Sequence, residues 1–290
     1  MKIELQNVSK SFSKNNALTE VSLEIEKGIF GLLGRNGAGK TTMMRLIANI
    51  LRPDVGKILV EGKNINEHEG YIQSILGYLP QNYGLYPYLT AYETMDYLAR
   101  LKGIANGEDR KSQINHILKK VGLIDKSNVK ISKLSGGMKQ RIGIAQAVLG
   151  TPKVIIVDEP TAGLDPEERM YFKNILAELA EDKIVILSTH IVSDVEDIGS
   201  KLAILKEGKL IFSGDTNALI GTISGHIYET VIPFNEVEKY RKDYCIVSTI
   251  HTGNEVKMKY VTTKNLIPNS RKVAASLIDS YIYSIGGLER

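Results

Sequence analysis

GIFGLLGRNGAGKTT, residues 28–42 of a chain of 290, joins a short apolar run to a glycine-rich turn and the start of a helical pattern. Residues 34–41 fit the pattern G-x-x-x-x-G-K-[ST] in full. Gly34, Gly37 and Gly39 let the turn wrap closely, because a side chain at any of them would keep backbone N–H groups away from phosphate oxygens. The helix that follows adds its positive end. The stretch therefore predicts a strand, a phosphate-binding loop and a helix.

The same loop carries the side chains that a nucleoside triphosphate needs. Lys40 is placed to neutralise the β- and γ-phosphates, and the Thr41 hydroxyl to ligate Mg²⁺. A glycine-rich turn without a ligand is the alternative, but the flanking strand and helix are the context that the motif requires. We therefore predict a nucleoside triphosphate and Mg²⁺ at this loop, with the nucleotide bound by Gly34, Arg35, Asn36, Gly37, Ala38, Gly39, Lys40, Thr41 and Thr42.

A pair of carboxylates follows a second apolar run. In KVIIVDEP, Asp158 and Glu159 come at the carboxyl end of a predicted buried strand, where ligands bind in open α/β sheets. Adjacent carboxylates repel each other unless a cation lies near them, and Mg²⁺ would supply that cation. We expect Asp158 to face the metal, and Glu159 to orient and deprotonate the water that attacks the γ-phosphate. A solvated acidic turn before Pro160 is the alternative.

His190 ends a third apolar run, KIVILSTH. Parallel strands of one sheet all end on the same side, so this histidine can reach the γ-phosphate region that Lys40 and Asp158 share. A polar histidine without a role is the alternative. The two motifs already placed favour a phosphate-sensing role, which makes His190 a second catalytic candidate beside Glu159.

Alternation of β-branched runs with helical stretches continues through the first 222 residues. It indicates an α/β fold with a mostly parallel sheet that is covered on both faces. VIIV and IVIL are continuously apolar, as strands buried on both faces should be. Residues 88–130 lack strong strand runs and carry apolar residues at helical spacing, so they predict a helical insert.

The pattern changes after residue 222. HIYETVI and CIVSTI predict strands, HTGNE a turn before VKMKYVTT, and VAASLIDSYIYSI, residues 273–285, a closing amphipathic helix. We expect residues 223–290 to form a small α+β accessory domain that packs against the first domain, and no motif assigns it a function of its own.

Composition sets limits on the environment and on the partners. The net charge is +4 and the basic residues are scattered, so the charge favours a membrane surface and nucleic acid equally weakly, and we expect no nucleic-acid partner. The single cysteine, Cys245, excludes an intramolecular disulfide and fits a reducing cytoplasm. Because no apolar run reaches the roughly 18 residues of a membrane-spanning helix, we expect any membrane role to come through a partner.

A second glycine pair opens a helix in LSGGMKQR, residues 134–141. Together with GRNGAGKTT, VIIVDEP, TAGLDP and STH in this order along the chain, it closely resembles the ATPase subunit of ATP-binding cassette (ABC) transporters over residues 1–222. The resemblance implies a P-loop ABC ATPase domain with a mostly parallel sheet, an antiparallel β part and a helical subdomain. It also implies hydrolysis of ATP to ADP and phosphate.

In this family the glycine pair is a signature that contacts the γ-phosphate of ATP held by a second subunit, in a head-to-tail dimer. Ser135, Gly136 and Gly137 have suitable chemistry, namely a hydroxyl, bare backbone N–H groups and a helix N-terminus. Such a terminus contributes about 0.3 to 1 kcal/mol toward an anion, which is too little to bind ATP alone. Met138 stands where many members have glutamine, so the polar contacts of the signature are expected to differ here.

Three further positions follow from the resemblance. Gln81, in GYLPQNYGLYP, matches the glutamine that touches Mg²⁺ and the attacking water and couples the ATP site to the membrane partner. Asp165, in TAGLDP, matches the loop that crosses the dimer interface. Phe12 occupies the position of the aromatic residue that stacks on adenine, which is usually tyrosine; a phenyl ring can still stack.

The implied partners are a second ATPase subunit and a transmembrane permease on a separate chain. Six of the fourteen tyrosines fall between Tyr78 and Tyr97, where the family receives coupling helices of the permease, and tyrosine suits such interfaces. Internal packing of the insert is the alternative. The implied location is cytoplasmic, peripheral on the inner face of the cell membrane.

Several functions within this superfamily compete. The P-loop, the signature and the appended C-terminal domain look most like bacterial type-2 exporters of drugs, peptides or lipid-linked material, and an importer ATPase is the alternative. Soluble relatives fit less well: those on ribosomes carry two cassettes per chain, and those on DNA insert long coiled coils between P-loop and signature. A nucleotide switch without turnover is disfavoured, because Glu159 and His190 are both present.

Overall fold

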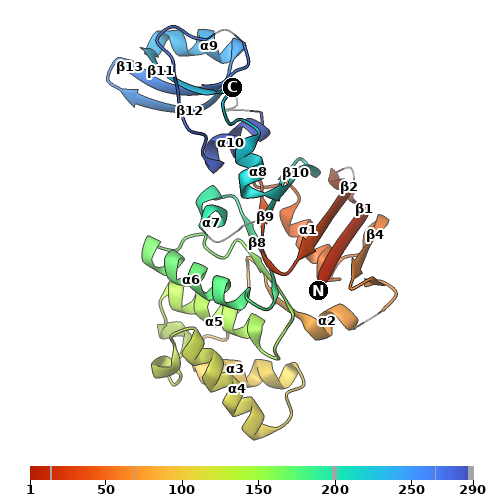
Figure 1. Ribbon diagram of the computed structural model, residues 1–290. Coiled ribbons are helices and arrows are strands. Elements are labelled where there is room, and N and C mark those ends of the chain that lie inside the picture. The colour runs from red at the N-terminus through yellow and green to blue at the C-terminus, as the bar shows by residue number, and fades with distance from the viewer. Residues whose placement is uncertain (14, 69, 198–200, 265, 287–290) are drawn as a thin grey trace.

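A six-stranded sheet forms the centre of the computed structural model, which describes residues 1–13, 15–68, 70–197, 201–264 and 266–286 (Figure 1). The strand order is β10-β9-β3-β8-β7-β6. Neighbours from β9 to β6 pair in parallel, whereas β10 lies antiparallel to β9. The predicted mostly parallel α/β sheet is therefore confirmed. The strands are β3 (Gly28–Leu33), β6 (Leu76–Leu79), β7 (Val154–Asp158), β8 (Ile184–Thr189), β9 (Lys201–Lys206) and β10 (Lys209–Asp215).

Both faces of the central strands meet a hydrophobic core, and every residue of β7 and β8 is buried. Along β7, Ile155 and Val157 pack into one cluster with α5 and α6, whereas Val154 and Ile156 pack into another with α1. This is why these strands show no alternation of apolar and polar residues. The covering helices are α1 (Lys40–Ile47), α5 (Gly136–Val148) and α6 (Pro166–Leu179).

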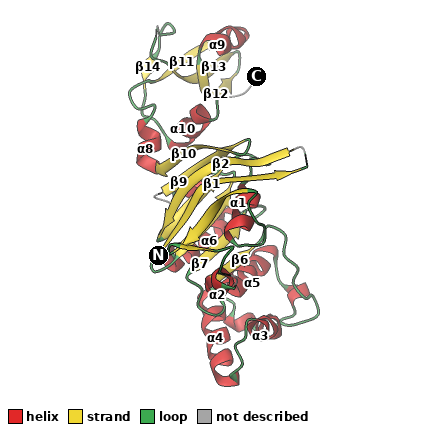
Figure 2. Cartoon of the chain, turned by 90° about the vertical axis from the view of Figure 1, so that its right-hand side faces the viewer, coloured by secondary structure: helices red, strands yellow, loops and turns green. Residues whose placement is uncertain are grey.

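An antiparallel sheet of order β2-β1-β4-β5 packs beside α1 and shares its core (Figure 2). It supplies the antiparallel part that the resemblance implies. Its strands are β1 (Lys2–Phe12), β2 (Asn15–Glu26), β4 (Val55–Val60) and β5 (Lys63–Asn64), and the short helix α2 (Tyr71–Ile75) follows them.

Helices form the end of the molecule farthest from the C-terminal sheet (Figure 1). A capping box between Thr90 and Glu93 starts α3, and the Asn106 side chain accepts a hydrogen bond from the backbone N–H of Glu108 at the start of α4. The regular elements within residues 88–130 are α3 (Ala91–Leu101), α4 (Gly107–Lys120) and the 3₁₀ turn η1 (Ile124–Lys126), and η2 (Ile131–Lys133) leads on to α5.

The C-terminal region contains a third sheet, of order β12-β13-β11-β14, with α9 packed on one face. The strands expected at HIYETVI and CIVSTI are β11 and β12. Helices α8 and α10 lie between this sheet and the central one (Figure 1). The elements are α7 (Val192–Glu196), α8 (Thr216–Gly221), β11 (Ile227–Pro233), η3 (Phe234–Glu236), α9 (Val237–Asp243), β12 (Cys245–Thr252), β13 (Glu255–Val261), β14 (Arg271–Lys272) and α10 (Leu277–Ser284).

The closing helix is shorter than its sequence pattern predicts. The closing helix begins at Leu277 rather than at residue 273, because Ser276 and Asp279 form a capping box and Val273 instead donates its N–H to the Ile227 carbonyl. Helix α1 ends at Ile47, since Asn49 adopts a left-handed conformation with φ of 54°. Within the described residues, no helix combines the length and the apolar character needed to cross a membrane.

Candidate nucleotide-binding site

A pocket of about 480 Å³ lies at the carboxyl ends of the parallel strands, above the start of α1. It collects residues from four separate segments of the chain, which the fold brings to one place. Its lining consists of Phe12, Asn15, Ala17, Asn36, Gly37, Gly39, Lys40, Thr41, Thr42, Gln81 and Glu159. Most of the predicted ATP-binding residues therefore meet around one cavity, at the edge of the sheet where open α/β folds bind ligands.

The loop before α1 needs its glycines for two different reasons. Gly39 has φ of 104°, and a Cβ on it would lie 2.5 Å from the Ala17 carbonyl oxygen. A Cβ on Gly34 would lie 2.5 Å from the carbonyl oxygen of Leu205. The loop is thus held between β2 and the end of β9, with the N-terminus of α1 facing the pocket.

Lys40 is almost fully buried at the base of this loop. Its Nζ donates to the carbonyl oxygens of Gly34 at 2.8 Å and Arg35 at 3.2 Å, and it lies 3.2 Å from Oε1 of Glu159. A buried ammonium group in this position can compensate negative charge in the pocket, and its carbonyl contacts hold it at the loop.

Three groups converge on the Glu159 carboxylate. Besides Lys40, Nδ1 of His190 lies 3.3 Å from Oε2, and Nε2 of Gln81 lies 3.4 Å from the same oxygen. Glu159 itself has φ of 48°, a left-handed conformation that is uncommon outside glycine. This strained residue turns the chain at the end of β7, so that its side chain meets the ends of β6 and β8.

Asp158 has one satisfied and one unsatisfied oxygen. The Ser188 hydroxyl donates to Oδ1, whereas Oδ2 is buried and has no hydrogen-bond partner among the described residues. A buried carboxylate oxygen without a partner fits a metal ligand, because hard cations such as Mg²⁺ prefer carboxylate and hydroxyl oxygens. Thr41, the predicted hydroxyl ligand, lines the pocket together with Gln81, so the donor set fits Mg²⁺.

The signature residues do not line this pocket. Ser135 caps α5, with its Oγ accepting a hydrogen bond from the Met138 N–H at 3.1 Å. A Cβ on Gly136 would meet open space, whereas a Cβ on Gly137 would lie 2.5 Å from Cδ of Glu168. Contact with Glu168 of α6 thus explains the glycine at position 137, whereas no described residue lies close enough to require a glycine at position 136.

Phe12 lines the pocket, whereas Asp165 lies outside it. Asp165 is exposed and caps α6, with Oδ1 accepting from the Glu168 N–H at 2.8 Å. Phe12 lines the pocket with an exposed ring, and Nζ of Lys10 lies 5.7 Å from the ring centroid. Phe12 therefore lies where a stacking role needs it, and Asp165 lies outside the pocket.

Sequence patterns missed a buried network behind the site. Asp194 of α7 is fully buried, and its Oδ2 accepts hydrogen bonds from the hydroxyls of Thr161 and Thr189. Nζ of Lys173 lies 3.3 Å from the other oxygen, Oδ1. The network ties the segment after Glu159 to the strand that ends before His190. Both threonines lie within motifs quoted above, Thr161 in TAGLDP and Thr189 in STH. Nothing in the sequence predicts that the Asp194 side chain accepts hydrogen bonds from both.

Comparison with known proteins identifies the family. The model of the ABC transporter family matches residues 18–162. The chain is 34% identical to the linearmycin resistance ATP-binding protein LnrL of Bacillus subtilis, over 81% of this chain and 76% of that protein. It is 35% identical to the bacitracin transport ATP-binding protein BcrA of Enterococcus faecalis, over 72% of this chain and 68% of that protein.

Solved structures agree with this result. The dimeric post-hydrolysis ATP-binding cassette MJ0796 with ADP and Pi is 28% identical, with a TM-score of 0.66 over 73% of this chain and 98% of that one. The chain belongs to the ABC transporter family, and the resemblance seen in its motifs is confirmed. It is an ATP-binding subunit of that family with a P-loop ATPase fold, and its activity is hydrolysis of ATP.

Proposed function

We propose that this protein powers the export of a substrate across a membrane, by hydrolysing ATP between two subunits that close head to tail. The observation that carries the proposal is the convergence of Lys40, Gln81 and His190 on Glu159 at the edge of the pocket. Export rather than import is supported by similarity to proteins named for linearmycin resistance and bacitracin transport.

Each group at the pocket has a role in the proposed reaction. Backbone N–H groups of residues 34–42 and the N-terminus of α1 bind the phosphates, and Lys40 shifts from the Gly34 carbonyl toward the γ-phosphate. Asp158, Thr41 and Gln81 would hold Mg²⁺, which supplies charge compensation for the phosphates when bound. Phe12 stacks on the adenine ring.

Glu159 acts on the attacking water. Its carboxylate orients the water and takes its proton, while Gln81 positions the water and His190 contacts the γ-phosphate from the end of β8. Departure of Lys40 toward phosphate frees Oε1 of Glu159, so nucleotide binding itself would prepare the base.

Dimer closure accounts for the groups outside the pocket. Ser135, Gly136 and Gly137 offer a hydroxyl and bare N–H groups at the start of a helix of thirteen residues, and Gly136 has open space around it. We propose that the γ-phosphate of ATP on a second subunit occupies that space. Met138 contributes its backbone there rather than an amide side chain, and the exposed Asp165 lies at the interface.

The permease contact is proposed at the exposed tyrosines near Gln81. Tyr88 is 83% exposed, and Tyr86 packs edge to face on Tyr97 with ring centroids 5.3 Å apart. Tyr83 instead faces inward, where its hydroxyl donates to the Lys139 carbonyl of α5. These tyrosines thus combine an exposed aromatic surface with contacts from Tyr83 to the signature helix, which suits a docking site for a transmembrane subunit. The protein would then lie on the cytoplasmic face of the membrane.

We also propose that the chain divides into an ATPase domain of residues 1–222, with the helical insert 88–130, and an accessory domain of residues 223–290. The separate sheet and core of β11 to β14 with α9 support this division.

Replacement of Glu159 by glutamine tests the proposal directly. We expect E159Q to lower ATP turnover by about 100-fold or more, because the base is lost while the phosphate contacts remain. With ATP and Mg²⁺ the variant should elute as a dimer in size-exclusion chromatography, and nucleotide binding by calorimetry should persist. Unchanged turnover would contradict the role of Glu159, and a persistent monomer would contradict dimer closure.

A further inference from the structure

Helix α10 lies between two hydrophobic cores. Leu277, Tyr281 and Ile285 recur at intervals of four residues, are nearly fully buried, and face the central sheet. Ile282 packs on the same cluster and also on the core of the C-terminal sheet. The helix therefore connects the C-terminal sheet to the ATPase fold by direct packing on both sides.

The hydrophobic core into which Leu277, Tyr281 and Ile285 pack also contains residues of two elements next to the nucleotide site. It includes Leu33, the last residue of β3 before the phosphate-binding loop, and Val195 of α7, which follows His190 closely in the chain. Contact between these elements is tight, because a Cβ on Gly31 of β3 would lie 2.7 Å from a methyl carbon of Val195.

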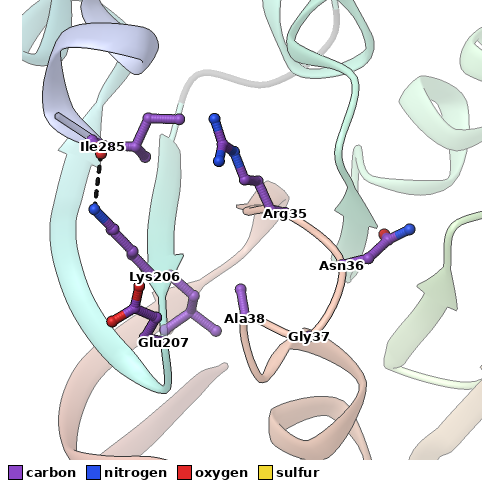
Figure 3. Close-up of a pocket in the computed structure, with 8 residues that line it drawn as sticks. Arg35, Asn36, Gly37, Ala38, Lys206, Glu207 and Ile285 are labelled. Carbon is purple, nitrogen blue, oxygen red and sulfur yellow. Dashed lines mark hydrogen bonds between the residues drawn. The ribbon is translucent and has the colours of Figure 1, made fainter. Parts of the chain in front are cut away.

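Lys206 links the end of α10 to the turn that contacts the phosphate-binding loop. Nζ of Lys206, at the end of β9, donates to the carbonyl oxygen of Ile285 at 2.9 Å (Figure 3). That carbonyl belongs to the C-cap of α10, where backbone oxygens lack helical partners and a cation is favourable.

The turn that carries Lys206 is in direct contact with the loop. The Leu205 carbonyl oxygen lies so near Gly34 that a Cβ on this glycine would be 2.5 Å from it. The Gly208 N–H donates to the Ala38 carbonyl at 3.1 Å. A small cavity of about 210 Å³ lies beside these contacts, and Figure 3 shows Lys206 and Ile285 on one side of it and Arg35 on the other.

We propose that Lys206 is a positioning residue of the phosphate-binding loop, through which the seating of α10 sets the affinity for ATP. When the Ile285 carbonyl holds Lys206, the turn at residues 205–208 is fixed, and with it Gly34 and Ala38. The inference rests on the proposed function, since it assumes that this loop binds ATP. Because coupling between two sites is reciprocal, bound nucleotide must in turn stabilise α10.

The first experiment replaces Lys206 by methionine, which keeps the unbranched apolar stem and removes the donor. We expect the Kd for ATP, measured by calorimetry in the full chain, to rise three- to tenfold, or about 0.7 to 1.4 kcal/mol. KM should rise by the same factor while kcat stays within about twofold, because Lys206 touches no reacting atom. The matched control is K209M, which removes an exposed lysine from the same hairpin and should leave Kd and KM unchanged.

The second experiment measures hydrogen exchange of the amides in α10 with and without ADP and Mg²⁺. In wild type and K209M we expect nucleotide to slow exchange in the last turn of α10, and in K206M this difference should vanish. A purely structural role would speed exchange equally with and without nucleotide. Equal nucleotide affinity in K206M and wild type, or no effect of nucleotide on α10, would overturn the proposal. Failure of wild type to bind nucleotide at all would instead refute the proposed function.

Discussion

Two largely buried glutamates with cationic partners have different surroundings in this molecule. The Glu159 side chain is 9% exposed and lies 3.2 Å from Lys40, and the Glu229 side chain in the C-terminal sheet is 7% exposed and lies 2.7 Å from Arg271. By burial and charge pairing alone the two are nearly the same. Pairing of a buried carboxylate is therefore a poor indicator of a functional site.

Backbone and topology separate the two glutamates. Glu229 lies in the regular strand β11, and its partners Arg271 and Lys257 come from the adjacent strands, so neighbours within one sheet neutralise one another. Glu159 has a left-handed backbone at the end of a strand and lines a pocket. Backbone strain and convergence of groups from separate strands, more than charge, therefore distinguish the site.

The largest effect should come from Lys40→Ala. We expect ATP affinity to fall by about 100-fold or more, because Lys40 is a buried cation of the proposed phosphate site. Calorimetry with ATP and Mg²⁺ measures this, and K57A, at an exposed lysine of β4, is the control. Retained ATP affinity in K40A would mean that the ion pair of Glu159, like that of Glu229, does not mark a nucleotide site.

A large effect confined to turnover should follow from Ser135→Arg. The new side chain would fill the space at the start of α5 that the proposed dimer needs, so hydrolysis should fall by at least about tenfold while each monomer binds ATP normally. Steady-state hydrolysis and calorimetry together measure the two quantities. Normal hydrolysis in S135R would show that the site is complete within one chain.

Substitutions of the two signature glycines should have effects of intermediate size, one on stability and the other on hydrolysis. Gly137→Ala must displace Glu168, which Arg141 holds with Nε 3.0 Å from Oε2, so we expect it to lower the free energy of unfolding by about 1 to 3 kcal/mol. Gly136→Ala has open space in a helical position, so it should not lower stability, while it should lower hydrolysis. Denaturant unfolding and turnover measure the pair, and equal stability losses would contradict the assignment.

The smallest effect should come from Glu229→Gln, which should leave ATP turnover unchanged and lower the free energy of unfolding by about 1 kcal/mol. Burial raises the pKa of Glu229, but hydrogen bonds from Arg271 and Lys257 outweigh it and hold the pKa below its ordinary 4.5. A lowered folded pKa means that this stabilisation is complete above about pH 4.5 and is lost as the pH falls through the folded value. Unfolding energies of wild type and E229Q should therefore converge in acid. A constant gap would contradict the pairing.

Local motifs made most of the nucleotide site predictable from the sequence. The glycine loop, the carboxylate pair and His190 each follow an apolar run, and parallel strands bring such ends together. The capped start of α10 at Ser276 could have been read from the serine and acid three residues apart, but apolar periodicity extended the prediction back to residue 273. The roles of Asp194 and Lys206 could not be predicted, because Thr161 lies 33 residues from Asp194 and Ile285 lies 79 residues from Lys206, and only the tertiary fold brings these residues together.

Ser188 joins Asp158 and Glu159 through one residue of the neighbouring strand. Its Oγ accepts the N–H of Glu159 at 2.9 Å, and its hydroxyl donates to Oδ1 of Asp158. The pairing of β7 with β8 therefore fixes the orientation of the Asp158 carboxylate and leaves Oδ2 as the oxygen that faces the proposed metal site. In S188A, affinity for Mg²⁺ should fall, because the Asp158 carboxylate loses the hydrogen bond that orients it.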